Sequence, residues 1–211
     1  MNPKGGMLML PEKSIDIIRE VINVGIGDAA AALSELVNTR IVVEVPDVLI
    51  MDSGDISGYL QREIKSLGVY ICQDFHGFFT GKTILFYTKE NSISLLNSLE
   101  GEVRYTSTLT ESGMATLQEI GNIILVSCIS TISDMMEGKI LFEMPHVTSE
   151  VSDGYFQNLL EGLTEFDKVI VIKNYMTVKE KDIKGYMFIL LGLSDLKMIV
   201  EKLEGKLTEG G

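Results

Sequence analysis

Two polar side chains with the same spacing occur twice in this 211-residue chain. Glu20 lies three positions before Asn23, and Glu119 lies three positions before Asn122. A carboxylate can anchor a lysine or arginine of a partner. An asparagine amide both donates and accepts hydrogen bonds, so it can hold a water molecule in a fixed orientation, but it is not a strong base. Such a pair suits reactions that need a positioned water, and phosphoryl hydrolysis is one of them.

A proline follows each motif at the same distance, which indicates a duplicated unit. Pro46 and Pro145 each come 23 positions after their asparagine, and all three motif residues are displaced by 99 positions between the copies. The match extends to the far end of each copy, because 99–101 and 203–205 both read Leu-Glu-Gly. We therefore predict two repeats, at about 12–101 and 110–205, within a single domain that spans 1–211.

The elements that must position the motifs follow from hydrophobic periodicity and turn signals. Each motif falls on the first helix of its repeat, a short strand follows that ends at the proline, and a hairpin and a last helix complete the unit. The expected helices are 12–37, 89–99, 110–137, 153–165 and 194–203, with a loop and a short helix in 47–66. The expected strands are 40–45, 68–74, 80–88, 139–143, 168–178 and 184–191.

This order of elements predicts the fold class. Sequential hairpins favour antiparallel pairing. We expect an α+β fold made of a duplicated helix-strand-hairpin-helix unit with pseudo-twofold symmetry, in which helices pack on one mostly antiparallel sheet.

A helical wheel separates the motif residues from the expected core. Asp16, Glu20 and Asn23 share one face of the first helix, and the opposite face carries Ile18, Val21, Ile22, Gly25, Ala29, Ala32, Leu33 and Leu36. Glu119 and Asn122 likewise face away from Leu117, Ile120, Ile124, Cys128 and Met135. One such pair would be ordinary surface, but two in register on apolar helices favour a function. Gly25 and Gly27 are expected to allow close packing of the first helix against a neighbour.

Composition bounds the partners. The formal net charge of −12 argues against nucleic acid and anionic membranes, which reward clusters of Lys and Arg. Two cysteines without a CxxC spacing exclude a zinc ribbon and a thioredoxin-type motif. The apolar stretch 114–132 carries several polar residues, so we expect a core helix and not a membrane span. A cytoplasmic protein is the expectation.

The doubled motif resembles that of the CheC family of chemotaxis phosphatases. That family's pattern is Asp or Ser, three residues, Glu, two residues, Asn, about 22 residues, then Pro. Residues 16–34 with Pro46 match it closely, and residues 119–122 with Pro145 match it as well. The resemblance covers about 12–205. The second copy departs at Ala115, where the family has Asp or Ser.

The resemblance implies that the chain dephosphorylates the phospho-aspartate of a CheY-like response regulator. Glu20 and Glu119 would pair with a lysine of the regulator, and Asn23 and Asn122 would orient the attacking water. The chain would need no cofactor of its own, because the Mg²⁺ would belong to the regulator. Asp16 would support the first motif, and the two prolines would be structural, each ending its strand.

Related types and other functions can be distinguished. The CheX type carries one motif copy, whereas this sequence has two. The FliY type has a further C-terminal flagellar-switch domain, for which this sequence has no room before Gly211. We therefore expect a stand-alone CheC-like protein. The alternative to catalysis is a binding module that regulates the receptor deamidase CheD. A structural role in a flagellar switch is a third, weaker interpretation.

Overall fold

The computed structural model describes residues 11–63, 68–99, 108–149, 166–178 and 181–209. Its elements are α1 (Glu12–Leu36), β1 (Ile41–Asp52), α2 (Ser53–Glu63), β2 (Gly68–Gly77), β3 (Gly81–Thr88), α3 (Lys89–Leu99), α4 (Glu111–Met135), β4 (Ile140–Phe142), β5 (His146–Ser149), β6 (Lys168–Val178), β7 (Lys181–Leu191) and α6 (Leu193–Glu209). The short helix expected at 153–165 lies outside the described residues.

The described strands form one antiparallel sheet in the order β1-β6-β7-β3-β2-β4, with β5 also pairing with β2. This order is symmetric between the two halves of the chain, because β1, β2 and β3 correspond to β4, β6 and β7. β1 of the first half pairs with β6 of the second, and β4 and β5 of the second half pair with β2 of the first. The predicted α+β class with a duplicated, pseudo-twofold, antiparallel arrangement is confirmed.

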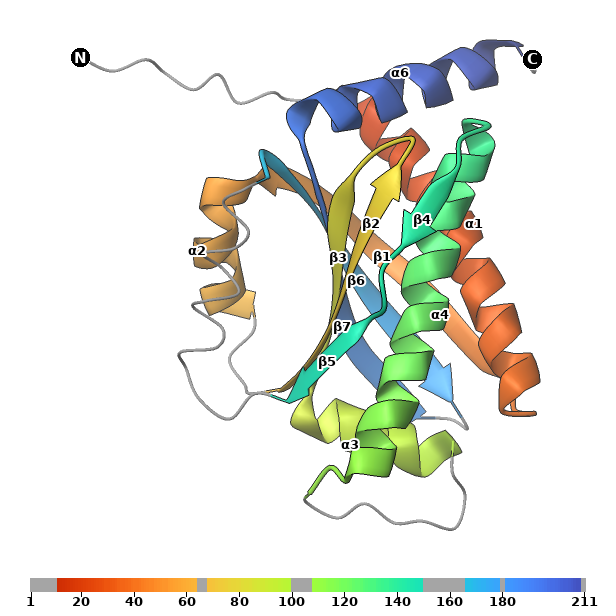
Figure 1. Cartoon of the computed structure of the whole chain (residues 1–211), viewed down its shortest axis with the longest axis vertical. Coiled ribbons are helices and arrows are strands. Elements are labelled where there is room, and N and C mark those ends of the chain that lie inside the picture. The colour runs from red at the N-terminus through yellow and green to blue at the C-terminus, as the bar shows by residue number, and fades with distance from the viewer. Residues whose placement is uncertain (1–10, 64–67, 100–107, 150–165, 179–180, 210–211) are drawn as a thin grey trace.

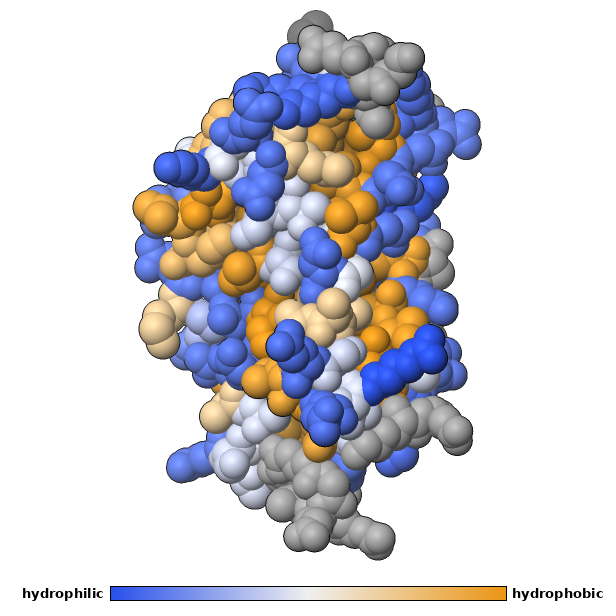
Figure 2. All heavy atoms as spheres, turned by 90° about the vertical axis from the view of Figure 1, so that its right-hand side faces the viewer, coloured by the Kyte–Doolittle hydropathy of each residue, from blue (hydrophilic) through white to orange (hydrophobic). Residues whose placement is uncertain are grey.

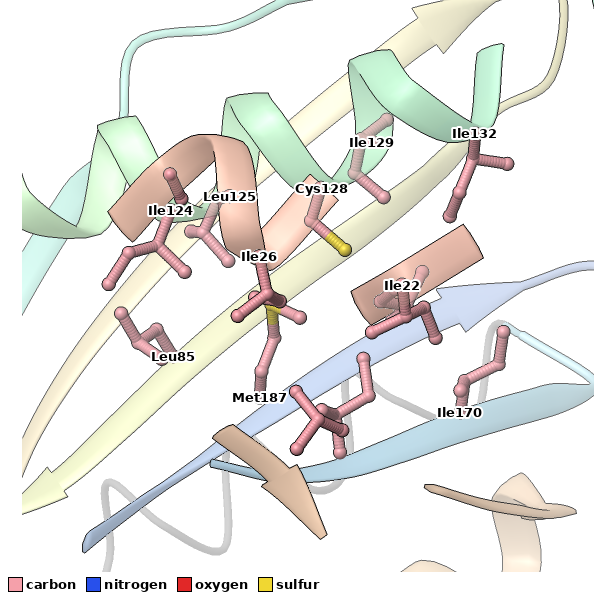
Figure 3. Close-up of a cluster of buried hydrophobic side chains, with 14 of the residues drawn as sticks. Ile22, Ile26, Leu85, Ile124, Leu125, Cys128, Ile129, Ile132, Ile170 and Met187 are labelled. Carbon is pink, nitrogen blue, oxygen red and sulfur yellow. The ribbon is translucent and has the colours of Figure 1, made fainter. Parts of the chain in front are cut away.

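The helices cover the two faces of the curled sheet unequally (Figure 1). The long motif-bearing helices α1 and α4 lie side by side on one face, and α2 lies on the other. The larger core cluster fills the space beneath α1 and α4, where Ile26 of α1 points toward Met187 of β7 and Ile22 lies nearer Ile170 of β6 (Figure 3). Each fully buried aliphatic side chain of this kind contributes about 1.5–3 kcal/mol. The core therefore fixes the two helices on the sheet.

A glycine sets how closely α1 approaches α4. A Cβ added at Gly25 would lie 2.9 Å from the Cα of Cys128 and 3.1 Å from the backbone oxygen of Ser127. The expected close packing is confirmed for Gly25. It is wrong for Gly27, where an added Cβ would meet nothing within 4 Å.

The two motif helices also end alike. α1 is followed by Asn38 at φ 48° and α4 by Glu137 at φ 58°, both in the left-handed region that closes many helices. Cys128 is buried, as expected of a small core residue, and burial raises the pKa of its thiol to about 12.

Parts of the expected helix faces are wrong. The helical wheel predicts Ala32, Leu36 and Met135 on the buried stripes, yet all three are exposed, Leu36 to 60%. Each lies toward the C-terminal end of its helix.

The expectation that Pro46 ends its strand is also wrong. β1 runs from Ile41 to Asp52 without a break, and its register against β6 shifts between Glu44 and Asp47. A proline lacks the N–H that a strand ladder needs, so it is tolerated at edge strands and at bulges. β1 is an edge strand of the described sheet and carries such an irregularity at Pro46.

The apolar stretch predicted as a core helix forms α4. Among the described residues, α4 is the one helix long and apolar enough to cross a membrane by length and composition, and 44% of its apolar window is buried. Leu117, Ile124 and Leu125 of this helix lie in the core cluster against the sheet. Core helices of soluble proteins meet the same criterion, so this is weak evidence for a span.

Candidate functional site

The first motif lies on the solvent side of α1. Asp16, Glu20 and Asn23 are all exposed, one turn apart from each other along the helix. Arg19 Nη1 donates to Asp16 Oδ1 at 2.6 Å, so Asp16 is already paired within the helix. Within the described part of the chain, the side chains of Glu20 and Asn23 have no hydrogen bond or ion pair. Both are therefore open to a partner.

Little side-chain bulk surrounds Asn23 on the surface of α1. Gly27 is exposed one turn further along α1, with open space where a side chain would stand. Val24 beside it is 42% exposed. A partner can therefore approach the Asn23 amide across a bare helix backbone and a small apolar contact.

The second motif, on α4, lies closer to the sheet. Glu119 is exposed, but Asn122 is half-buried. Gln73 of β2 donates through Nε2 to Asn122 Oδ1 at 3.0 Å and to the backbone oxygen of Glu143 at 3.0 Å. The helix approaches β2 closely here, because a Cβ at Gly121 would lie 2.7 Å from Ile71 Cγ2. The two asparagines thus have different surroundings.

The segment between β4 and β5 borders the second motif. Gln118 Nε2 donates to the backbone oxygen of Pro145 at 3.0 Å, and the backbone oxygen of Glu143 is held by Gln73. Met144 lies between these two anchored residues and is 83% exposed. The second motif therefore has an exposed apolar side chain at its border. Polar and apolar side chains alternate over the face of the molecule that carries α1 and α4 (Figure 2).

The expected difference at Ala115 has a structural counterpart. Asp16 pairs with Arg19 in the first helix, whereas the same positions in the second hold Ala115 and Gln118, and Gln118 bonds to Pro145 instead. Pro145 lies between two strands after β4 has ended, in agreement with the expectation for it.

The sequence reasoning missed two residues. Gln73 contacts Asn122 and is 2% exposed. The sequence could have indicated it only as a polar residue at an inward-facing position of an otherwise apolar strand. Met144 carries no motif at all; its exposure follows from the course of the chain between β4 and β5.

The chemistry available is that of carboxylates and amides. Among the described residues no group of three or more His, Cys, Asp or Glu side chains could hold a metal ion. Each motif offers one exposed carboxylate to anchor a cation and one amide to orient a small polar molecule.

Comparison with known proteins gives consistent relatives. No family model matches the chain. The CheY-P phosphatase CheC of Bacillus subtilis (strain 168) is 24% identical over 191 residues, which cover 86% of this chain and 89% of CheC.

Solved structures agree on the fold. The crystal structure of FliY from Thermotoga maritima superposes with a TM-score of 0.72 at 20% identity, covering 94% of this chain and 100% of the FliY chain. The FliM middle domain from H. pylori follows at 0.63 and 12% identity, covering 92% of this chain and 99% of that domain. The fold does not separate the stand-alone CheC type from the FliY type. Together with the doubled Glu-x-x-Asn motif, the sequence likeness to CheC and the shared fold support a CheC/FliY-type protein.

Proposed function

We propose that this protein is a phosphatase that hydrolyses the phospho-aspartate of a CheY-like response regulator at two sites. The observation that carries the proposal is the duplicated Glu-x-x-Asn pair on two long helices that the core packs on the sheet. Glu20, Asn23 and Glu119 are exposed, and Asn122 is half-buried. The likeness to a CheY-P phosphatase supports it.

In this proposal Glu20 and Glu119 pair with a lysine of the regulator. Exposed ion pairs contribute only about 0.2–1 kcal/mol, so the glutamates mainly set orientation and the rate of docking. Asn23 and Asn122 hold the attacking water in line with the phosphorus. Water adds to phosphorus as the bond to the aspartyl oxygen breaks, which yields the free carboxylate and inorganic phosphate. The Mg²⁺ that balances the phosphoryl charge is expected on the regulator.

The division of roles follows from the chemistry of an amide. An amide does not take the proton of water, so its contribution is alignment, and a misplacement of about 1 Å at a reacting centre can cost ~100-fold in rate. The response regulator is a cytoplasmic signalling protein, so this function also implies a cytoplasmic location.

The test is phosphate release from a phosphorylated receiver domain in the presence of Mg²⁺. Asn23→Ala and Asn122→Ala are each expected to keep the activity of the other site. The double variant is expected to lose about 100-fold or more of the stimulated rate.

Two results would count against the proposal. Full activity in the Asn23→Ala/Asn122→Ala variant would falsify it. Tight binding to CheD, with phosphate release from the unmodified chain no faster than from the double variant, would favour the regulatory binding module instead.

A further inference from the structure

A buried amide stands out in β2. Gln73 is 2% exposed and lies on the same side of the strand as Ile71 and Phe75, which belong to the core beneath α4. Burying an amide among apolar side chains is unfavourable unless the amide is hydrogen-bonded. Its Nε2 makes two bonds, to Asn122 Oδ1 and to the backbone oxygen of Glu143, each at 3.0 Å. The residue therefore links the motif to the β4–β5 segment.

These two bonds fix the orientation of both amides. The backbone oxygen of Glu143 can only accept, so the branch of Gln73 that faces it must be the NH₂ group. The same NH₂ lies 3.0 Å from the Asn122 side chain, so Asn122 must present its oxygen to Gln73. The NH₂ of Asn122 then lies on the other branch, and no described residue accepts a hydrogen bond from it.

The first motif has no such arrangement. Asn23 is exposed and has no side-chain partner among the described residues. The amide in the corresponding place on β6 is Asn174, which lies between Ile172 and Met176 as Gln73 lies between Ile71 and Phe75. Its Oδ1 is 3.5 Å from Tyr87 Oη, and it makes no bond to the motif.

We propose that Gln73 is a positioning residue for the second site: it holds Asn122 in one rotamer and one amide orientation. This inference rests on the proposed function. The second site enters the reaction with an ordered amide, whereas Asn23 becomes ordered only when the regulator docks. Immobilising a free side chain opposes binding and catalysis, so loss of Gln73 should slow the second site alone.

The kinetic test isolates the second site in an Asn23→Ala background. Gln73→Met keeps the length of the side chain and removes both hydrogen bonds. The expected result is a kcat about fivefold lower, equivalent to ~1 kcal/mol and to the net contribution of one hydrogen bond, with KM changed less than twofold. The matched control is Asn174→Leu, which removes a buried amide from the same face of the sheet. Asn174 bonds to Tyr87 and to neither motif, and the first motif is already disabled in this background, so kcat should stay unchanged.

A purely structural effect gives a different pattern. If Gln73→Met merely loosens the fold, kcat falls equally in an Asn122→Ala background, where Gln73 has no amide to hold. An equal loss in both backgrounds, or no loss in the Asn23→Ala background, overturns the proposal.

A second measurement does not depend on activity. In ¹H–¹⁵N spectra of the unmodified protein, the side-chain NH₂ signals of Asn122 should be rigid on the picosecond–nanosecond timescale and those of Asn23 mobile. Each pair is identified by its loss in the corresponding Asn→Ala variant. Mobile Asn122 signals overturn the assignment of Gln73 even if phosphate release is normal. Conversely, rigid signals with no phosphate release uphold the Gln73 contact and reject the proposed function.

Discussion

Replacing Gly25 by alanine tests the contact that holds the two motif helices together. The added methyl would lie 2.9 Å from the Cα of Cys128 and 3.1 Å from the Cβ of Thr131, well inside the usual carbon–carbon separation of about 3.5–4.0 Å. The obstacle is backbone, so no change of the Cys128 side chain relieves it. α1 and α4 must move apart, or the substitution must strain both.

The magnitude follows from two opposing effects. Alanine is better than glycine inside a helix by about 0.5–1 kcal/mol. Overpacking a tight contact costs about 1–3 kcal/mol. Gly25→Ala should therefore change the free energy of unfolding by between about 0 and −2.5 kcal/mol. Gly27→Ala, in the same helix but with open space around it, gains the propensity without the clash and should stabilise the fold by about 0.5–1 kcal/mol.

Urea unfolding followed by far-UV circular dichroism measures the difference, because both substitutions leave the number of helical residues unchanged and the chain has no tryptophan. The two variants should differ by about 1–3 kcal/mol, with Gly25→Ala the less stable. If Gly25→Ala is as stable as Gly27→Ala, the two helices are not in the contact described.

Three further predictions concern other parts of the molecule. Met144→Ser should raise KM for the phosphorylated regulator about fivefold at the second site with kcat unchanged, because it removes apolar surface beside the motif. The control is Met135→Ser, which removes an exposed methionine ~20 Å along α4 from Asn122. An equal rise in KM there would contradict a specific role for Met144. Asp52→Asn should destabilise the fold by about 1–3 kcal/mol in urea melts, because Lys168, 5% exposed, loses its counter-charge; the effect is limited since the Asp52 side chain is 45% exposed. Finally, burial raises the pKa of Cys72 from 9.0 to about 11. Between pH 9 and 11 the unfolded thiol is ionised and the native one is not, so stability falls as pH rises, and Cys72→Ala should reduce that slope.

The sequence was sufficient for the order of elements and for the first motif. Periodicity predicts both ends of α1 and of α4 to within two residues. The helical wheel correctly puts Glu20, Asn23 and Glu119 on the solvent-exposed faces. These features depend on local patterns, which a single sequence records.

The remaining features depend on contacts between distant elements. Asn122 is half-buried because α4 lies against β2 at Gly121, and nothing in the helix itself signals that approach. Gln73 acquires its role from two partners, 49 and 70 positions away. The sequence predicts a strand end at Pro46 because proline usually interrupts a ladder, yet an edge strand has a free side and can carry a proline at a register shift.

The exchange of strands between the two halves has a consequence for how such a chain can be divided. β1 is completed by a strand of the second half, and β4 and β5 by a strand of the first. A fragment ending before α4 would leave β1 and β2 with bare hydrogen-bonding edges, which are templates for aggregation. Two fragments cut between α3 and α4 and expressed together should therefore recover the sheet only by reassociating. We therefore expect that neither half, expressed alone, presents its copy of the motif on a folded sheet.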